Sequence, residues 1–323
     1  MQNQLPKNLM GAIRYFADPD VCLDFVAAMR WPRGVTCPHC GADRVSYLST
    51  RQIWKCMNGE CHKQFSAKVG TIFEESPIPL DKWMVAVWMI VNCKNGVSSW
   101  ELHRAINVTQ KTAWFMLHRI RLAMQDRYFG TKLDGEVEAD ETFIGGKARN
   151  MHRSRRADAI TNAPNRGKTV VVGLLERGGQ VRTSVVPSVS RPVLQGEVRK
   201  HVKAGAALYT DKMHSYIGLS PKYLHQIVDH AVRYVDGRVH TNGLENFWSL
   251  LKRGIGGTYV SVEPFHLFRY LDEQTFRFNN RATKDNPLDD RDRFMLAVSQ
   301  IANKRLTYAE LTGKARQTQE PPF

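Results

Sequence analysis

The sequence predicts an α/β fold, in which a mixed sheet with flanking helices follows a small cysteine-rich module and a helical segment. Three observations predict it. Four of the six cysteines cluster between residues 37 and 61. Apolar residues recur at helical spacing through residues 75–127. From Gly135 onward, short alternating or apolar runs separated by turn residues indicate strands, and helical spacing returns after Gly243.

A length of 323 residues suits two or three domains. The changes in pattern divide the chain into four segments: an N-terminal helix with the cysteine module, a helical segment, the α/β domain and a C-terminal helical tail. We expect their bounds at 1–70, 71–130, 131–285 and 286–323.

The composition bounds the partners and the compartment. Lys and Arg outnumber Asp and Glu by 46 to 31, which favours a polyanionic partner such as nucleic acid, although a solvated cationic surface gives the same balance. The N-terminus lacks the layout of a signal peptide. The longest apolar run, residues 83–91, is far shorter than the roughly 20 residues that span a bilayer. We therefore expect a soluble, cytoplasmic protein without a membrane partner.

The cysteine spacing predicts a metal site. Two residues separate Cys37 from Cys40, fifteen separate the pairs, and four separate Cys56 from Cys61. Each pair forms a tight knuckle whose thiolates point at one ion, and four sulfurs without a water position make a structural site for Zn²⁺. Basic residues surround this predicted zinc ribbon, and the pattern leaves open whether it contacts DNA or protein: Arg44, Arg51, Lys55, Lys63 and Lys68.

The helical segment has the layout of a helix-turn-helix. Ser98 and Thr109 are placed to cap two helices separated by a short turn. Such a second helix enters the major groove by its N-terminal residues, so Gln110 and Lys111 are the first candidates for DNA contact, and Arg119 is a third. An ordinary helical hairpin is the alternative, because the apolar residues of both helices would form a core either way.

The following segments alternate or are apolar, as strands are, with one helix among them. They read as three strands, a helix, a strand, and then mixed strand and helix, which is the order of an RNase H-like fold. The segments are 135–146, 169–179, 180–189, 192–202, 206–211 and 225–230.

A basic stretch, residues 147–168, separates the first two predicted strands. It carries seven Lys or Arg against one acid, Asp158. Such a run is commonly a solvated loop, but its position after the strand bearing Asp140 makes a DNA-backbone contact an equal alternative. The candidates for that contact are Arg153, Arg155 and Arg156.

Three carboxylates stand out by position. Asp140 falls in mid-strand, where a charge is unexpected, and Asp211 ends a strand. Glu245 begins a helix, and Lys252 lies seven residues later on the same helical face. Two-metal phosphoryl transfer needs several carboxylates that converge on two Mg²⁺ ions roughly 4 Å apart. Any one of these acids could otherwise be a solvated side chain or a helix cap.

These motifs together resemble the DDE transposases of bacterial insertion sequences that carry an N-terminal zinc ribbon, the ISXO-type group. The matching pieces are CPHC…CxxxxC, the KTAW-containing segment, DETFIGGK, LYTDKMHSY and HTNGLENFWSLLKRGIGGTY, between residues 20 and 283. The resemblance implies that activated water nicks the element ends and that the freed 3′-hydroxyl attacks target DNA. It makes Asp140, Asp211 and Glu245 ligands of two Mg²⁺ ions, for which Mn²⁺ can substitute, and it places Lys252 near the scissile phosphate.

The resemblance also implies partners: double-stranded DNA, as terminal inverted repeats and target, and a homodimer or higher multimer on the bacterial nucleoid. Two alternatives remain. One is a transposase-derived DNA-binding regulator without catalysis, and the other is a metal-dependent nuclease without strand transfer. The repeat sequence, the target preference, the choice between cut-and-paste and copying, and the multimer state cannot be read from the sequence.

Several neighbours of the carboxylates keep two interpretations. Glu138 shares the strand face of Asp140, so it either assists a metal or forms a salt bridge, whereas alternation puts Glu141 on the opposite face. His240 and Asn242 either orient a ligand or order the loop into the helix. Trp248, at helical spacing from Glu245, is expected in the core.

Overall fold

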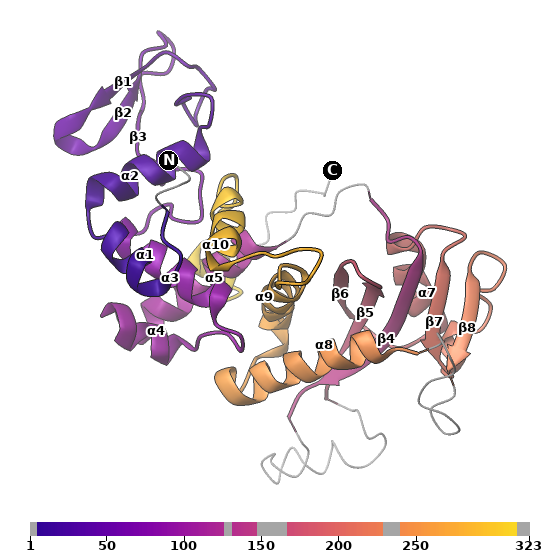
Figure 1. Cartoon of the computed structure of the whole chain (residues 1–323). Coiled ribbons are helices and arrows are strands. Elements are labelled where there is room, and N and C mark those ends of the chain that lie inside the picture. Colours follow the sequence, from indigo (N-terminus) through magenta and orange to yellow (C-terminus); the bar gives the residue numbers. More distant parts are fainter. Residues whose placement is uncertain (1–4, 126–130, 147–166, 229–239, 315–323) are drawn as a thin grey trace. The chain divides into compact units, whose positions relative to one another are not determined.

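The computed structural model describes residues 5–125, 131–146, 167–228 and 240–314. The chain divides into two compact units, which we describe separately (Figure 1). One unit, the helical unit, comprises residues 1–125 together with 282–323, and the other, the α/β unit, comprises residues 126–281. The described part of the predicted C-terminal tail therefore belongs to the helical unit.

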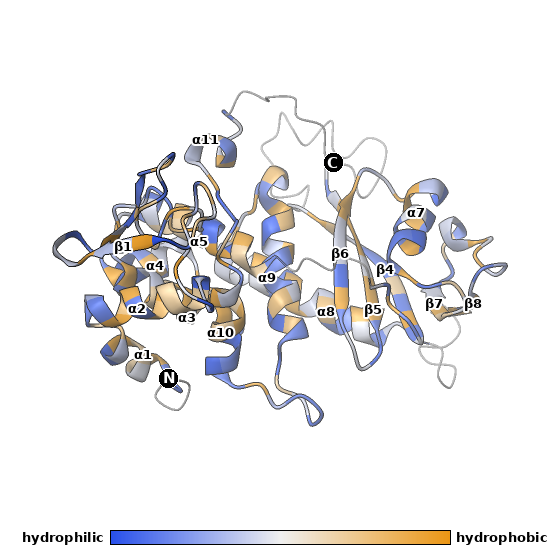
Figure 2. Ribbon diagram, turned by 90° about the horizontal axis from the view of Figure 1, so that it is seen from above, coloured by the Kyte–Doolittle hydropathy of each residue, from blue (hydrophilic) through white to orange (hydrophobic). Residues whose placement is uncertain are grey.

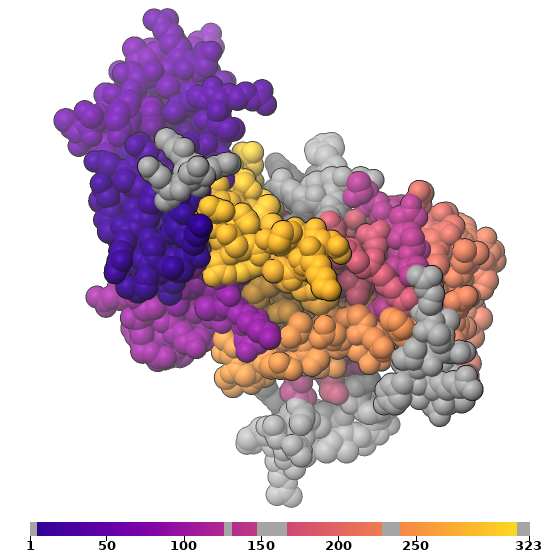
Figure 3. Space-filling model, in the orientation of Figure 1, coloured from indigo at the N-terminus to yellow at the C-terminus, as the bar shows by residue number. Residues whose placement is uncertain are grey.

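Seven α-helices of the described residues build the helical unit around aromatic side chains. The ring of Phe294, from the C-terminal part of the chain, lies 5.1 Å from Trp88, 5.7 Å from Phe16 and 5.8 Å from Phe25. Figure 3 shows this yellow C-terminal segment beside the indigo N-terminal helices. The helices are α1 (Leu9–Tyr15), α2 (Pro19–Arg30), α3 (Leu80–Asn92), α4 (Ser99–Ile106), α5 (Gln110–Met124), α10 (Asp290–Ser299) and α11 (Tyr308–Leu311).

The predicted caps of the two-helix motif are confirmed. Ser98 accepts a hydrogen bond from the backbone of Glu101, and the Glu101 side chain accepts one from the backbone of Ser98, so that both orphan N–H groups are satisfied. Asn107 ends α4 in the left-handed region at φ 51°. Thr109 then caps α5 by accepting from the backbone of Thr112.

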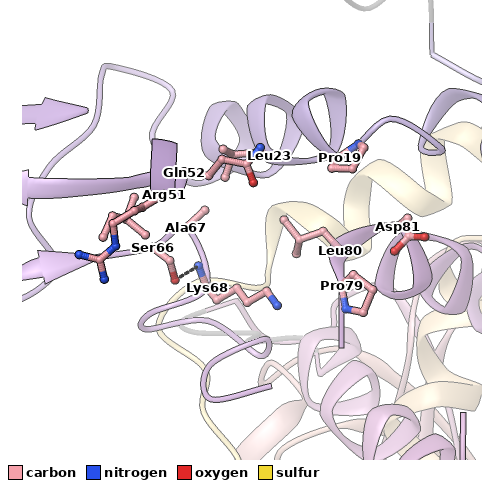
Figure 4. A pocket seen from close by; sticks show the side chains of 11 residues that line it. Pro19, Leu23, Arg51, Gln52, Ser66, Ala67, Lys68, Pro79, Leu80 and Asp81 are labelled. Atoms are coloured by element: carbon pink, nitrogen blue, oxygen red, sulfur yellow. Dashed lines mark hydrogen bonds between the residues drawn. The ribbon is translucent and has the colours of Figure 1, made fainter. Parts of the chain in front are cut away.

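The cysteine-rich module is a three-stranded antiparallel sheet, in the order β1 (Val45–Leu48), β2 (Ile53–Cys56) and β3 (Gln64–Phe65). A short 3-10 helix, η2 (Ser49–Arg51), joins the first two strands. Trp31, Trp54 and Phe65 pack together, with ring centroids 5.4 to 6.2 Å apart. A cavity of about 410 Å³ opens between this sheet, α2 and the first turn of α3 (Figure 4).

The α/β unit is built on a mixed five-stranded sheet, as predicted. The strand order is β6-β5-β4-β7-β8; β5 is antiparallel to β4 and β6, and β7 is parallel to β4 and β8. The strands are β4 (Glu136–Ile144), β5 (Thr169–Glu176), β6 (Val181–Val186), β7 (Ala207–Asp211) and β8 (Leu224–Val228). The helical elements are α7 (Arg191–His201), η4 (His214–Tyr216), α8 (Asn242–Arg253), the π-helical turn η5 (Gly254–Tyr259), η6 (Pro264–His266) and α9 (Leu267–Asn279).

Each face of this sheet has its own core because strand side chains alternate. One core joins Ala139 and Leu174 to α7, and the other joins Val171 and Leu175 to α8 and α9. Strand β5 is apolar on both faces, and in Figure 2 most of it is orange. No helix in the described parts of the chain is both long and apolar enough to span a membrane.

Candidate functional site

The four predicted zinc ligands come together in the cysteine-rich sheet. Their sulfur atoms all lie within 4.8 Å of one another. In the first knuckle the backbone N–H of Gly41 donates to the carbonyl of Cys37, and in the second the N–H of Cys61 donates to the carbonyl of Asn58. These tight turns aim the paired thiols at a common point.

The sulfur geometry fits zinc. The Sγ atoms of Cys37 and Cys61 are 3.8 Å apart, and those of Cys40 and Cys56 are 3.6 Å apart. A tetrahedron with Zn–S bonds of 2.3 Å has sulfur atoms about 3.8 Å apart, whereas a disulfide bond is about 2.0 Å long. Four thiols at this spacing therefore suit a closed, structural Zn²⁺ site.

Two of the three predicted catalytic carboxylates meet in the α/β unit. The parallel pairing of β4 with β7 ends at Ala139 and Thr210, so the next residues, Asp140 and Asp211, lie side by side where β7 ends. Carboxylate oxygens of Asp140, Asp211 and a further residue, Glu141, lie within 4.8 Å of one another. Oxygen ligands at this spacing fit a hard cation such as Mg²⁺.

The electrostatics of this carboxylate group favour a bound cation. Burial raises the pKa of Asp140 to about 6, the charges of Asp211 and Glu245 add to the rise, and the indole of Trp248 opposes it by donating to Asp140. Burial likewise raises the pKa of Glu141 to about 7, with help from the charges of Asp211 and Asp140. Half-buried carboxylates that repel one another gain stability from a positive ion.

Glu141 was not among the predicted ligands, because alternation places it on the opposite strand face. The structure keeps it on that face, where its carboxylate accepts a hydrogen bond from the hydroxyl of buried Tyr216. It nevertheless reaches the group, because β7 ends at Asp211 and no strand residue pairs with β4 beyond Ala139 on that side. The only signal in the sequence was its adjacency to Asp140.

Glu245 and Lys252 both lie on α8. Glu245 occupies the first turn with an exposed side chain, outside the group of three, and its charge acts on Asp140. Lys252 is exposed in the last turn. Seven residues of helix separate the two by about 10 Å along one face.

Glu138 forms buried ion pairs, which is the salt-bridge alternative of its two predicted roles. Its carboxylate is 1% exposed, and it accepts hydrogen bonds from the Nε of Arg177 and the backbone N–H of Leu244, each at 3.0 Å. The carbonyl of His240 accepts from Arg177 at 2.7 Å, which holds the residue two positions before α8. Asn242, the first residue of that helix, is exposed.

The predicted DNA contacts of α5 divide into exposed and buried residues. Lys111 is exposed, and Gln110 is half-buried with its amide donating to Ser99 at 2.8 Å. Arg119 is only 5% exposed, and its guanidinium donates to the carbonyls of Leu306, Ile72 and Glu74. This corrects the prediction for Arg119, because a guanidinium held by three carbonyls ties chain segments together and does not reach a phosphate.

A segment from the end of the chain explains this burial. We call residues 304–308 the C-terminal strap. Lys304 donates to the carbonyls of Ala123 and Gln125 at the end of α5, and the ring of Tyr308 lies 4.7 Å from the ammonium of Lys111 at its start. The strap thus contacts both ends of α5, and Lys111 in the first turn stays exposed beside it.

Other predicted basic contacts have mixed positions. The ammonium of Lys68 donates to the carbonyls of Ser76 and Ile78, and this fixes the chain that leads from the ribbon to α3. Arg51 is exposed and donates to Gln64 at 2.9 Å. The candidates of the basic stretch, Arg153, Arg155 and Arg156, lie outside the described residues.

A mixed five-stranded sheet with carboxylates in the middle of β4 and at the end of the adjacent β7, preceded by a four-cysteine ribbon, defines an α/β protein of the RNase H-like class. Residues 132–279 match the ISXO2-like transposase domain, and residues 18–64 match the transposase zinc-ribbon domain. The chain thus contains an ISXO2-like transposase domain and a transposase zinc ribbon.

A curated relative supports the same placement. The chain is 28% identical over 277 residues to an uncharacterised protein in transposable element ISH50 of Halobacterium salinarum, covering 81% of this chain and 91% of that protein. Among solved structures, a chain of the simian T-cell lymphotropic virus intasome in complex with PP2A regulatory subunit B56 gamma aligns over 72% of this chain and 76% of its own length. Its sequence identity is 12% and its TM-score 0.28, too low to support a statement about the fold.

Proposed function

We propose that this chain is an active insertion-sequence DNA transposase, which hydrolyses a phosphodiester bond at each element end and then joins the freed 3′-hydroxyl to target DNA. One observation carries the proposal: Asp140, in the middle of β4, and Asp211, at the end of the adjacent parallel strand β7, lie together, and the charge of Glu245 on α8 acts on Asp140. The match of residues 132–279 to a transposase domain supports the reaction class.

The carboxylates define where the metal ions would bind. Asp140 and Asp211 would be ligands of the metal ions, and Glu245 would complete the ligand set from α8. Glu141 is a fourth candidate ligand. Two Mg²⁺ ions bound there would activate the attacking oxygen and stabilise the leaving oxygen. Mn²⁺ favours the same ligands and can replace Mg²⁺.

Lys252 would hold the DNA beside this site. An exposed ammonium about 10 Å along α8 from Glu245 is placed to contact a backbone phosphate while the reacting phosphate lies over the carboxylates. A lysine contributes affinity here as a point charge and carries no sequence information.

The helical unit would recognise the terminal inverted repeats. We propose that the first turn of α5, with Gln110 and Lys111, reads the major groove, because Lys111 is exposed there and the residues that follow it in the helix are half-buried or buried. Arg153, Arg155 and Arg156 would bind the backbone. Zinc would hold the ribbon folded through Cys37, Cys40, Cys56 and Cys61, and the ribbon would add a further DNA contact or a protein contact.

Two element ends must be held together, so we propose a homodimer or higher multimer on DNA, acting in the cytoplasm on the bacterial nucleoid. Double-stranded DNA, as element ends and as target, is the proposed substrate. A net charge of +15 supports a polyanionic partner.

A plasmid that carries the two element ends tests the proposal. In Mg²⁺ the wild-type chain should nick at the ends and yield joined products, and Asp140→Asn and Asp211→Asn should yield neither. Asp285→Asn, a matched change at an exposed aspartate, should behave as the wild type. Hydrolysis without joining would indicate the nuclease alternative, and binding without cleavage would indicate the regulator.

A further inference from the structure

Strand β5 carries a glycine directly opposite Asp140. Gly173 is the cross-strand partner of Asp140, so both residues face the side of the sheet on which α8 packs. A glycine weakens the interior of a strand and commonly marks a close approach of another group. Here the missing side chain leaves an open position beside the Asp140 carboxylate.

The indole of Trp248 fills that position. A Cβ atom added at Gly173 would lie 2.6 Å from Cζ2 of Trp248 and 2.9 Å from a methyl group of Leu244, closer than side chains tolerate. Trp248 is 4% exposed, and its Nε1–H donates to Oδ2 of Asp140 at 2.9 Å. The glycine thus admits the ring that holds this carboxylate.

The start of α8 is fixed to the same strand face. The carboxylate of Glu138, two residues before Asp140, accepts from the backbone N–H of Leu244 at 3.0 Å and takes the place of a side-chain cap, which Thr241 does not supply. A Cβ atom at Gly243 would lie 2.8 Å from Oε2 of Glu138. These contacts fix where α8 begins on the sheet, and therefore where Trp248 lies relative to Asp140.

We propose that Trp248 is a positioning residue, which fixes the orientation of the Asp140 carboxylate from α8, and that Gly173 makes this contact possible. The inference rests on the proposed function, in which Asp140 binds the catalytic metal ions. An indole N–H is a donor only, so Trp248 neither binds a cation nor accepts a proton. Its hydrogen bond occupies Oδ2 from one side and turns the remaining lone pairs of the carboxylate toward Asp211 and Glu141.

The prediction separates this role from simple core packing. Partners of this kind orient metal ligands, and their loss typically costs 10- to 100-fold in metal affinity or activity. Trp248→Phe keeps an aromatic ring but removes the donor, and Gly173→Ala keeps the donor but displaces the ring. Both should weaken Mn²⁺ binding roughly 10- to 100-fold and raise the Mg²⁺ concentration for half-maximal nicking by a similar factor.

Two controls match these changes. Trp83 is a 1% exposed tryptophan of the helical unit whose indole donates to Ser76, so Trp83→Phe removes the same group and a similar hydrogen bond away from the carboxylates. Gly196 has open space around an added Cβ, so Gly196→Ala tests glycine replacement itself. Both controls should stay within about twofold of the wild type, well inside the range expected for lost ligand orientation.

The readout is Mn²⁺ affinity of the full-length, zinc-loaded chain without DNA, from the electron paramagnetic resonance signal of free Mn²⁺, alongside the Mg²⁺ dependence of nicking. Where Trp248→Phe does not fold, 3-benzothienylalanine at position 248 keeps the fused ring and removes only the N–H. Its expected effect is the same loss of affinity.

The outcomes separate the inference from the proposed function. Wild-type Mn²⁺ affinity in the folded Trp248 variant overturns the inference, while joined products from the wild type leave the proposed function standing. Weakened Mn²⁺ binding in a chain that never cuts or joins DNA supports the positioning role and refutes the transposase. If the wild-type chain binds no Mn²⁺, or if Asp140→Asn leaves its Mn²⁺ binding unchanged, both the inference and the proposed function are overturned.

Discussion

Replacing Glu138 with alanine should destabilise the α/β unit more than the same replacement of an exposed acidic residue of the sheet. The carboxylate is 1% exposed and holds both Arg177 and the first turn of α8. Removing one partner of a buried ion pair costs about 3–5 kcal/mol, because the other charge is left uncompensated. Arg177 keeps Glu136 at 3.8 Å and the carbonyl of His240, so the lower end, about 3 kcal/mol, is expected.

Urea unfolding of the full chain, followed by far-ultraviolet circular dichroism, measures this loss. With a slope of about 2 kcal/mol/M, the transition of the α/β unit should move down by about 1.5 M. Glu136→Ala is the matched control, because that side chain is 30% exposed and its ion pair with Arg177 is longer. Losing this longer pair and the hydrogen bond from the Tyr209 hydroxyl should cost about 1–2 kcal/mol. A Glu138→Ala shift as small as that of the control would refute the argument from burial.

The remaining predictions concern acid stability, zinc and DNA. The imidazole of His201, 3.5 Å from the Glu197 carboxylate, lowers the pKa of Glu197 from 4.5 to about 2, so the folded state gains stability above pH 4.5 that is lost as the pH falls toward 2. Glu197→Gln should flatten the pH dependence of the melting temperature there, and an unchanged acid limb would contradict it. Cys40→Ser should abolish the one equivalent of bound zinc, measured by atomic absorption, and leave the melting of the α/β unit unchanged; retained zinc would count against the four-sulfur site. Lys252→Ala should weaken binding to element-end DNA and lower the magnitude of the slope of log affinity against log salt concentration by about 1. Lys222→Ala, a change at another exposed lysine, is the control. Equal slopes for Lys252→Ala and the wild type would argue against a phosphate contact.

Local signals were sufficient for much of the fold. The caps at Ser98 and Thr109 depend on residues three positions apart, and the apolar run of β5 needs no distant partner to mark a strand. The cysteine spacing also encodes its geometry, because each knuckle is closed by hydrogen bonds between residues no more than four positions apart. Short-range patterns of this kind can be read directly from the chain.

Other features depend on distant parts of the chain and could not be predicted. Arg119 is buried because Leu306, 187 residues away, lies over it. Glu141 joins Asp140 and Asp211 only because the pairing of β4 with β7 stops at Ala139, one residue before Asp140. The hydrogen bond of Trp248 to Asp140 likewise requires the register that puts a glycine opposite the aspartate. Alternation and helical spacing give a face but not the contacts on it.

In the proposed function, Asp140 and Asp211 bind the metal ions needed to join element ends to target DNA. A precut element end with a free 3′-hydroxyl, incubated with the zinc-loaded chain, supercoiled target plasmid and Mg²⁺, tests it without the preceding nicking step. We expect joined products that disappear in EDTA and in Asp140→Asn and Asp211→Asn, while both variants keep their zinc and their binding to element ends. Joining that persists in either variant, or without a divalent ion, would contradict it.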